Sequence, residues 1–228
     1  MAKKYGILVI FIFLIATQFL SGCSIGYIAE SAYYQIKLLN NREPIDEVIA
    51  NPETSQEIKD KLLLAKEVQK YSVETLGLKK SDNYNSYVEL GRPYVTYVVS
   101  ASPKNKLEHH TWWFPIVGSV PYKGYFYPEG AKEEKKRLLE DDLDVYVRGV
   151  TAYSTLGWFN DPLLSSMIRY SNYSLANVII HENVHATIYI SSSAGFNERL
   201  ATYIGDVGAE LYFKSKEGEN GCGSNGCK

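Results

Sequence analysis

The sequence predicts an α+β fold, and three features of the chain support this prediction. Apolar residues recur at helical spacing near the start, β-forming residues gather in the middle, and two helical segments follow one another near the end. The 228 residues suffice for one domain with a sizeable core. We expect helices over residues 25–39, 55–75, 129–140, 172–189 and 196–213, and extended segments over 94–100, 143–147 and 150–159.

The helices expected over 25–39 and 55–75 are supported by different sequence patterns. Segment 25–39 has small residues on one helical face and aromatic residues on another. In segment 55–75 the apolar residues recur three or four positions apart, which places them on one face of a helix. Gly77 then offers a residue suited to ending that helix. The apolar positions are Ile58, Leu62, Ala65, Val68 and Tyr71.

The middle of the chain is rich in β-forming residues. Residues 94–100 are mostly Tyr and Val, and residues 143–147 alternate between polar and apolar side chains, both of which are typical of strands. Pro and Gly punctuate the aromatic stretch 112–127, which predicts turns there. The charged segment 129–140 reads as a helix, and 150–159 as a further extended segment that Asn-Asp-Pro closes.

The last two helices are predicted to lie next to each other. The helix over 172–189 has Ser171 or Asn172 as a polar cap. A short loop, 191–195, leads into the final helix over 196–213. Because the loop is short, we expect the second helix to fold back antiparallel to the first.

Composition is that of a globular protein, with 45% hydrophobic and 22% charged residues. The formal net charge of -2 supports neither a nucleic-acid partner nor a polybasic membrane contact, so we expect no nucleic-acid binding. The 19 Tyr residues combine an apolar ring with a polar tip, which suits peptide-binding clefts as well as ordinary packing.

Residues 1–22 have the pattern of a lipoprotein signal peptide. Two lysines precede an apolar run from Tyr5 to Leu20 that is too short for a comfortable membrane span. The run ends in Leu-Ser-Gly-Cys, which resembles a bacterial lipobox, so we expect cleavage before Cys23 and a lipid on that residue. A short transmembrane anchor is the alternative. In either case the protein lies in the cell envelope, and Ser24 implies the periplasmic face of the outer membrane if the source is Gram-negative.

The folded domain is expected over residues 23–213, followed by a flexible, Gly-rich tail over 214–228. Cys222 and Cys227 lie in this tail, where an exported pair could close a small disulfide loop. A metal clip is a weaker alternative, because no other soft ligand lies near in sequence.

Residues 181–185 read His-Glu-Asn-Val-His and match the His-Glu-x-x-His motif. Residues four positions apart lie on one face of a helix, so His181 and His185 can point at one cation. Glu182 is the candidate general base, because a zinc ion lowers the pKa of its water toward neutrality. The alternative is a helix that carries two surface histidines.

Glu198 is the candidate third metal ligand, since a catalytic zinc site needs three protein ligands and one open position. The expected turn after the first helix would bring Glu198 opposite His181 and His185. Its alternative role is to stabilise the dipole at the start of the last helix. The surrounding Asn-Glu-x-x-Ala sequence favours the ligand.

The two motifs together resemble those of the gluzincin metallopeptidases, to which thermolysin belongs, although the segment between them is shorter here. From Cys23 to about Gly208, the chain more specifically resembles the bacterial family of predicted aminopeptidases. The segments that carry this resemblance, beside the lipobox, are 113–118, 122–126, 144–149 and 152–162.

The resemblance implies a zincin-like metallopeptidase domain, with a small sheet over an active-site helix and a following helix that bears a ligand. It also implies an edge strand upstream of His181 that pairs with the substrate backbone. We expect this strand over 152–157, with an ordinary core strand as the alternative. The expected substrate-binding residues are Ala152, Ser154, Thr155, Leu156 and Gly157.

Peptide hydrolysis also needs a group that stabilises the developing charge on the carbonyl oxygen. Tyr153 is the first candidate, because a phenol on the expected substrate strand could reach the open side of the metal. The weaker candidates for roles in the site are Tyr125 and Tyr189 for the oxyanion, His109 and His110 for catalysis, and Thr202 and Asp206 for hydrogen bonds to a ligand residue.

The sequence therefore predicts zinc-dependent hydrolysis of peptide bonds by an envelope protein, with Zn²⁺ as cofactor, a peptide as substrate and a lipid anchor in the membrane. Aminopeptidase activity rests on the resemblance alone, and an endopeptidase of the same clan is one alternative. A non-catalytic, zinc-binding envelope lipoprotein is another. Glu182 argues against the latter, because a protein that only holds zinc has no need of a base.

Overall fold

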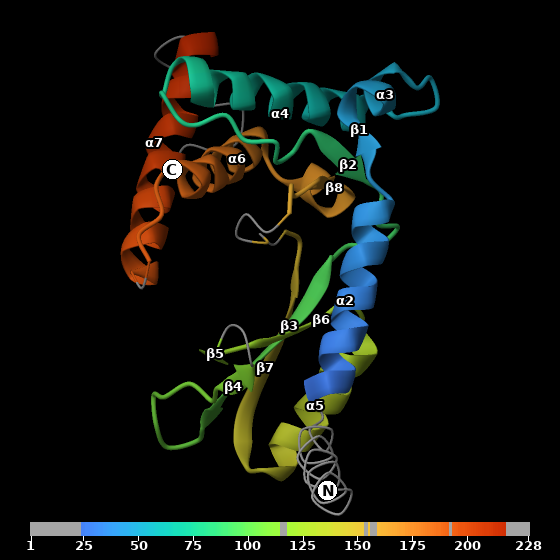
Figure 1. Ribbon diagram of the computed structural model, residues 1–228, viewed down its shortest axis with the longest axis vertical. Helices are drawn as coiled ribbons and strands as arrows, with labels where there is room; N and C mark the ends of the chain where they lie inside the picture. The colour runs from blue at the N-terminus through green and yellow to red at the C-terminus, as the bar shows by residue number, and fades with distance from the viewer. Residues whose placement is uncertain (1–23, 115–117, 153–154, 156–158, 192, 218–228) are drawn as a thin grey trace, which may run out of the picture. The chain divides into compact units, whose positions relative to one another are not determined.

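The computed structural model describes residues 24–114, 118–152, 155, 159–191 and 193–217 (Figure 1). The chain divides into two compact units. The first unit contains the described residues up to Asn40 together with Val98–Val147, and the second contains Asn41–Tyr97 and the described residues from Arg148 onward. The prediction of one domain over 23–213 stays a prediction.

The second unit combines helices with a small three-stranded sheet. In the sheet, β2 lies between β1, to which it is antiparallel, and β8, to which it is parallel. Tyr87 pairs with Glu43 on one side and with Leu163 on the other. The elements are β1 (Glu43–Pro44), α3 (Ile45–Ala50), α4 (Gln56–Glu74), β2 (Ser86–Val88), β8 (Leu163–Leu164), the 3-10 helix η1 (Ser165–Arg169), α6 (Asn172–Thr187) and α7 (Ala194–Glu217).

Serine caps start both α4 and α6. The Ser55 hydroxyl accepts a hydrogen bond from the backbone N–H of Ile58, and the Ser171 hydroxyl accepts one from Ser174, so each satisfies a donor at an exposed helix end. The apolar faces of α4 and α6 are buried against each other and against α7. The buried residues of these faces include Leu62, Ala65, Val68, Leu175, Ile179, Ile180 and Val184.

Two glycines let α7 lie close against α6, its most extensive packing partner (Figure 1). A Cβ added at Gly208 would lie 2.9 Å from Leu76 and 3.2 Å from the Ile180 side chain. A Cβ at Gly205 would lie 3.2 Å from the Asn177 carbonyl oxygen and 3.4 Å from the Cβ of His181. The backbone of α7 therefore passes directly beside the helical turn that carries His181.

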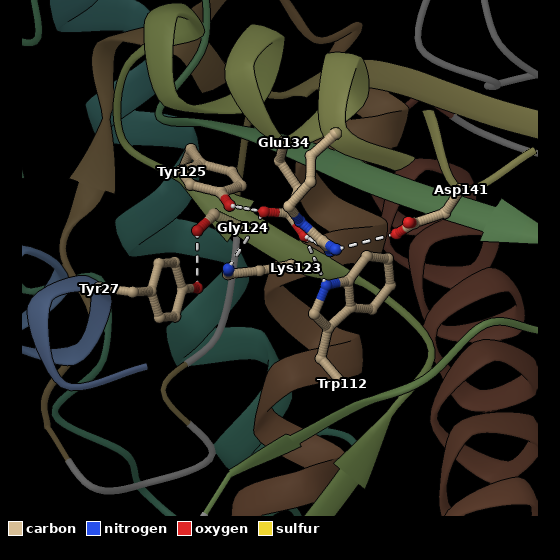
Figure 2. Close-up of polar contacts among 8 residues, drawn as sticks. Tyr27, Trp112, Lys123, Gly124, Tyr125, Glu134 and Asp141 are labelled. Atoms are coloured by element: carbon tan, nitrogen blue, oxygen red, sulfur yellow. Dashed lines mark hydrogen bonds and ion pairs between the residues drawn. The ribbon is translucent and has the colours of Figure 1, made fainter. Parts of the chain in front are cut away.

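The first unit contains α2, α5 and two small sheets. One sheet has the strand order β6-β3-β7, and the other is the antiparallel pair β4-β5, in which Trp113 lies opposite Ser119. Figure 2 shows buried polar contacts of this unit, centred on Glu134. Its elements are α2 (Ser24–Asn40), β3 (Thr96–Pro103), β4 (Trp112–Phe114), β5 (Gly118–Val120), β6 (Lys123–Tyr125), α5 (Pro128–Glu140) and β7 (Leu143–Val150), with the ends of β3 and β7 falling in the second unit.

The mixed α+β class predicted from the sequence is confirmed, and each expected helix is present. The helix expected to run to Tyr189 ends at Thr187, and the helix expected to end at 213 continues to Glu217. Past the end of β7 at Val150, the described residues of the expected extended segment 150–159 lie in no strand. The aromatic stretch 112–127, expected to form turns, also contains the short strands β4, β5 and β6.

Among the residues that the structure describes, no helix combines the length and apolar character that crossing a membrane requires.

Candidate metal centre

Three side chains from α6 and α7 bring their ligand atoms together at one point. The Nε2 atoms of His181 and His185 lie 3.1 Å apart. One carboxylate oxygen of Glu198 lies 3.5 Å from the His181 Nε2, and the other lies 3.4 Å from the His185 Nε2. In the described part of the chain, this is the one group of three or more His, Cys, Asp or Glu residues arranged to hold a metal ion.

The helical spacing and the short connection between α6 and α7 explain this convergence. His181 and His185 are four positions apart on α6, so both half-buried rings lie on the same face of the helix. Glu198 lies near the start of α7, which packs against α6. The side chain of Glu198 is 61% exposed, so the donor group has an open side toward solvent.

Asn197 fixes the chain immediately before Glu198. It is buried, and its side-chain amide donates a hydrogen bond to the carbonyl oxygen of Ile190 at 2.9 Å and accepts one from the Ile190 N–H at 3.0 Å. The backbone N–H groups of Phe196 and Asn197 also donate to the carbonyl oxygen of Ser193. These bonds hold the entry to α7 and thereby the position of Glu198.

The surroundings of His181 favour metal binding. Burial and the adjacent His185 lower the pKa of His181, while Glu198 and Asp206 oppose this change. A lowered pKa keeps the His181 imidazole neutral, which is the form that binds a metal. The carboxylate of Asp206 accepts a hydrogen bond from Asn177, one turn before His181 on α6.

The donor set fits a divalent cation. Two imidazole nitrogens and one carboxylate, with an open side, are the ligands that catalytic zinc sites use. The Nδ1 of His185 is buried and has no hydrogen-bond partner among the described residues, so its Nε2 is the nitrogen available to the group of three.

Glu182 is half-buried beside His181, in the same unit as the buried phenol of Tyr84. Burial raises the pKa of Tyr84 well above its usual value, and the negative charges of Glu182 and Asp161 raise it further. The phenol of Tyr84 is therefore close enough to the candidate base Glu182 for the charge of Glu182 to affect it. Tyr84 also has a positive φ of 58°, which is unusual for a bulky residue.

The expected substrate strand is only partly within the described residues. Tyr153, Ser154, Leu156 and Gly157 lie outside them, as does Cys23. Ala152 is half-buried and lies in no strand. Thr155 donates hydrogen bonds from its backbone N–H and its hydroxyl to the carboxylate of Asp161, at 2.8 and 2.7 Å.

The weaker candidates fall in different places. Thr202 and Asp206 are exposed on α7, the helix of Glu198, and Tyr189 is exposed just after α6. Tyr125 lies in the first unit, where its hydroxyl donates to Glu134. His109 is exposed in the same unit, and the ring of His110 stands edge-on to Trp112.

A comparison with protein-family models identifies the chain over residues 26–224 as a match to the family described as "Putative aminopeptidase". The chain belongs to this family. The match covers both units and all three metal-ligand candidates. No curated protein and no solved structure shows a significant match.

Within this aminopeptidase family member, sequence reasoning missed two residues near the site. Asn197 was noted only as part of the Asn-Glu-x-x-Ala sequence, although its buried amide holds the connection before Glu198. Tyr84 carries no motif, and only its backbone conformation and burial point to it. An Asn immediately before a ligand residue is the one signal that the sequence contained.

Proposed function

We propose that this protein is a zinc-dependent peptidase of the cell envelope that removes residues from the amino end of peptides. The observation that carries the proposal is the convergence of His181, His185 and Glu198 beside Glu182. The description of the family supports action at the amino end. The lipobox at Cys23 supports a lipid anchor on the periplasmic face of the outer membrane.

His181, His185 and Glu198 would hold the zinc ion. The bound ion would polarise the scissile carbonyl and lower the pKa of a water molecule. Glu182 would accept the proton from the attacking water and later pass it to the leaving amine, the two transfers of a general acid–base catalyst. The neutral imidazoles and the carboxylate of Glu198 would keep the ion in place throughout.

The substrate groups of the proposal come from the segment after β7. Residues 152–157 would pair with the substrate backbone, and the hydroxyl of Tyr153 would donate to the carbonyl oxygen as negative charge develops there. The zincin-like fold belongs to this proposal and rests on the resemblance of the two metal-binding motifs.

The test compares two variants of the full chain, purified in detergent, for zinc content and peptide cleavage. Glu182→Gln should keep its zinc and lose turnover by roughly a hundredfold or more, because only the proton carrier is removed. His185→Ala should lose both zinc and turnover. Glu53→Gln, at an exposed position before α4, should match the unchanged protein.

Three results would contradict parts of the proposal. Equal zinc loss in Glu182→Gln and His185→Ala would overturn the assignment of base and ligand. Cleavage of acetylated peptides as fast as free ones would identify an endopeptidase. A zinc-loaded chain that cleaves no peptide would point to a non-catalytic zinc-binding lipoprotein.

A further inference from the structure

The first unit contains a cavity of about 330 Å³ whose walls are mainly aromatic, here called the tyrosine cavity. One wall is a single face of α2, because three of its four residues follow Tyr27 by three, four and seven positions. The other wall is the segment that leads from β6 into α5. The lining residues are Tyr27, Glu30, Ser31 and Tyr34 on the first wall, and residues 125–127, 129 and 130 on the second.

The rings of the tyrosine cavity contact one another in edge-to-face and tilted pairs. Tyr27 and Tyr125 meet edge to face, with centroids 5.4 Å apart at 69°. The ring of Tyr34 lies 4.8 Å from that of Tyr127 at 59° and 5.8 Å from that of Phe126 at 37°. All five aromatic rings line the tyrosine cavity, and aromatic side chains are the ones with which proteins bind organic cations.

Hydrogen bonds hold the two inner rings in place (Figure 2). The Tyr27 hydroxyl donates to the carbonyl oxygen of Gly124 at 2.7 Å, and the Tyr125 hydroxyl donates to Glu134 at 3.0 Å. Gly130 lets the Tyr125 ring pack onto the start of α5, since a Cβ there would lie 2.5 Å from the ring. With their hydroxyl groups engaged, both rings are held in fixed orientations before a ligand arrives.

A cation already lies against these rings. The ammonium of Lys123 is 4.6 Å from the centroid of Tyr27 and 5.4 Å from that of Tyr125. Its charge is balanced by Glu134, 3.4 Å away in a position shielded from solvent. The Lys123 contact shows that these rings suit an alkylammonium group. Because the charge of Lys123 is neutralised by Glu134, other residues determine the electrostatic potential in the cavity.

Glu30 and Glu129 make the electrostatic potential at the cavity negative. Both are exposed residues of the cavity lining, and neither forms an ion pair with any residue that the structure describes. Burial raises the pKa of Tyr27, and the charges of Glu134 and, to a smaller extent, Glu30 raise it further, so the charge of Glu30 is felt at this ring of the cavity. Two carboxylates without a cationic partner, at the edge of an aromatic cavity, attract a positive charge.

We propose that the tyrosine cavity binds an organic ammonium group. Aromatic faces favour a weakly hydrated organic cation over a small metal ion that keeps its water shell. The two carboxylates disfavour an anion. A volume of about 330 Å³ is near the small end of ligand sites, roughly 300–1,000 Å³, and suits a head group or metabolite rather than a large ligand.

The proposal is independent of the peptidase function, since every residue of the tyrosine cavity lies in the first unit and none belongs to the metal centre. Two sources share the ammonium chemistry. One is a lipid head group, and the other is a soluble amine. The experiment below separates them.

The test titrates choline into the full chain by calorimetry, in a maltoside detergent that carries no ammonium group. The comparison ligand is dimethylbutanol, the neutral isostere of choline in which carbon replaces the nitrogen. Choline should bind about tenfold more tightly, because only choline gains the attraction of the ring faces and carboxylates. Equal binding of the two compounds, or no binding of choline, would overturn the proposal.

Paired variants locate the binding. Glu30→Gln should weaken choline binding several-fold, whereas Glu133→Gln, at an exposed position of α5 outside the cavity, should leave it unchanged. Tyr34→Leu should weaken choline binding more than dimethylbutanol binding, and Tyr146→Leu, at an exposed position of β7 outside the lining, should not. If the two Glu variants behave alike, choline binds elsewhere and the proposal fails.

Vesicles distinguish the two sources. Stronger binding to phosphatidylcholine than to phosphatidylglycerol vesicles, displaced by free choline and lost in Glu30→Gln, would identify a lipid head group. Choline binding without any preference between the vesicles would identify a soluble amine. Both results support the proposed ammonium site.

Discussion

The side-chain amide of Asn197 makes two hydrogen bonds with the backbone of Ile190, one from each end of the amide. Asn197 is only 2% exposed, whereas Ile190 is exposed, so the two bonds are partly shielded from water. They join the start of α7 to the chain that leaves α6, next to the ligand candidate Glu198. Asn197 is therefore placed to position Glu198 in the candidate metal centre.

Removing this amide should weaken metal binding. Asn197→Ala removes both hydrogen bonds to Ile190, whose carbonyl oxygen keeps only the bond from the Ser193 N–H, at a cost of about 1–3 kcal/mol in the free energy of unfolding. Zinc affinity should fall roughly 10- to 100-fold, as it does when groups that orient metal ligands are lost. Competition with a chromogenic chelator measures the affinity, and urea unfolding measures the stability.

Arg199→Ala is the matched control for Asn197→Ala, because Arg199 flanks Glu198 on the other side and is exposed. This variant should keep the zinc affinity of the unchanged protein. An Asn197→Ala variant that is destabilised yet binds zinc normally would show that the amide only supports the fold.

The close packing of α6 against α7 should not tolerate a larger residue at Gly208. Gly208→Val should lower the free energy of unfolding by about 1–3 kcal/mol, because the new side chain would overlap Leu76 and Ile180. Gly195→Ala, at an exposed position of the same helix with only the Arg199 side chain nearby, should be neutral or mildly stabilising. Thermal and urea unfolding of the two variants test this prediction, and equal stabilities would refute it.

The buried carboxylate of Glu134 should make the first unit sensitive to acid. Burial opposes its ionisation, but hydrogen bonds from Arg137 and Trp112 and the charge of Lys123 outweigh burial and lower its pKa to about 2. A lowered pKa stabilises the folded state above the ordinary pKa of 4.5, and this stabilisation, about 2–3 kcal/mol, is lost as the pH falls from 4.5 toward 2.

Glu134→Gln tests this assignment. The variant should be less stable than the unchanged protein at pH 7 and should differ little from it near pH 2, where about half of Glu134 is itself protonated. Glu133→Gln, at the neighbouring exposed position, should show no such dependence. Denaturation curves at several pH values measure the difference, and a constant gap between Glu134→Gln and the unchanged protein would count against the assignment.

Cys23 should be the site of lipid attachment. Cells that express the unchanged chain should incorporate labelled palmitate into the protein, and Cys23→Ser should abolish incorporation. Cys222→Ser removes a Cys of the tail and serves as the control, which should keep the label. Labelling of the Cys23→Ser variant would show that the lipobox assignment is wrong.

The convergence of the three candidate metal ligands was predictable because short-range rules determine it. Four-residue spacing aligns His181 and His185 on any helix, and a short connection brings the next helix back beside them. Glu198 then follows from its place early in that second helix. The same rules account for the confirmed helices, whose apolar spacing extends over several turns.

Features that depend on tertiary contacts were not predictable in this way. The bonds between Asn197 and Ile190 require a particular backbone path that no periodicity encodes. Strands β4, β5 and β6 have three residues each, too few for a recognisable alternation. The left-handed conformation of Tyr84 contradicts its residue type and is imposed by its surroundings.

Because the connection between α6 and α7 is short, His181, His185 and Glu198 are close together along the chain as well as in space. A metal ion bound by all three would therefore benefit from a chelate effect. Closing a short segment of chain costs less conformational entropy than closing a long one, so a cation gains more from a ligand supplied by the next helix than from one far along the chain. The backbone hydrogen bonds at Ser193 and those of the Asn197 amide already order this connection, so less conformational entropy is lost when a cation binds. Slow amide hydrogen exchange in this connection should therefore accompany tight zinc binding, and faster exchange should accompany its loss.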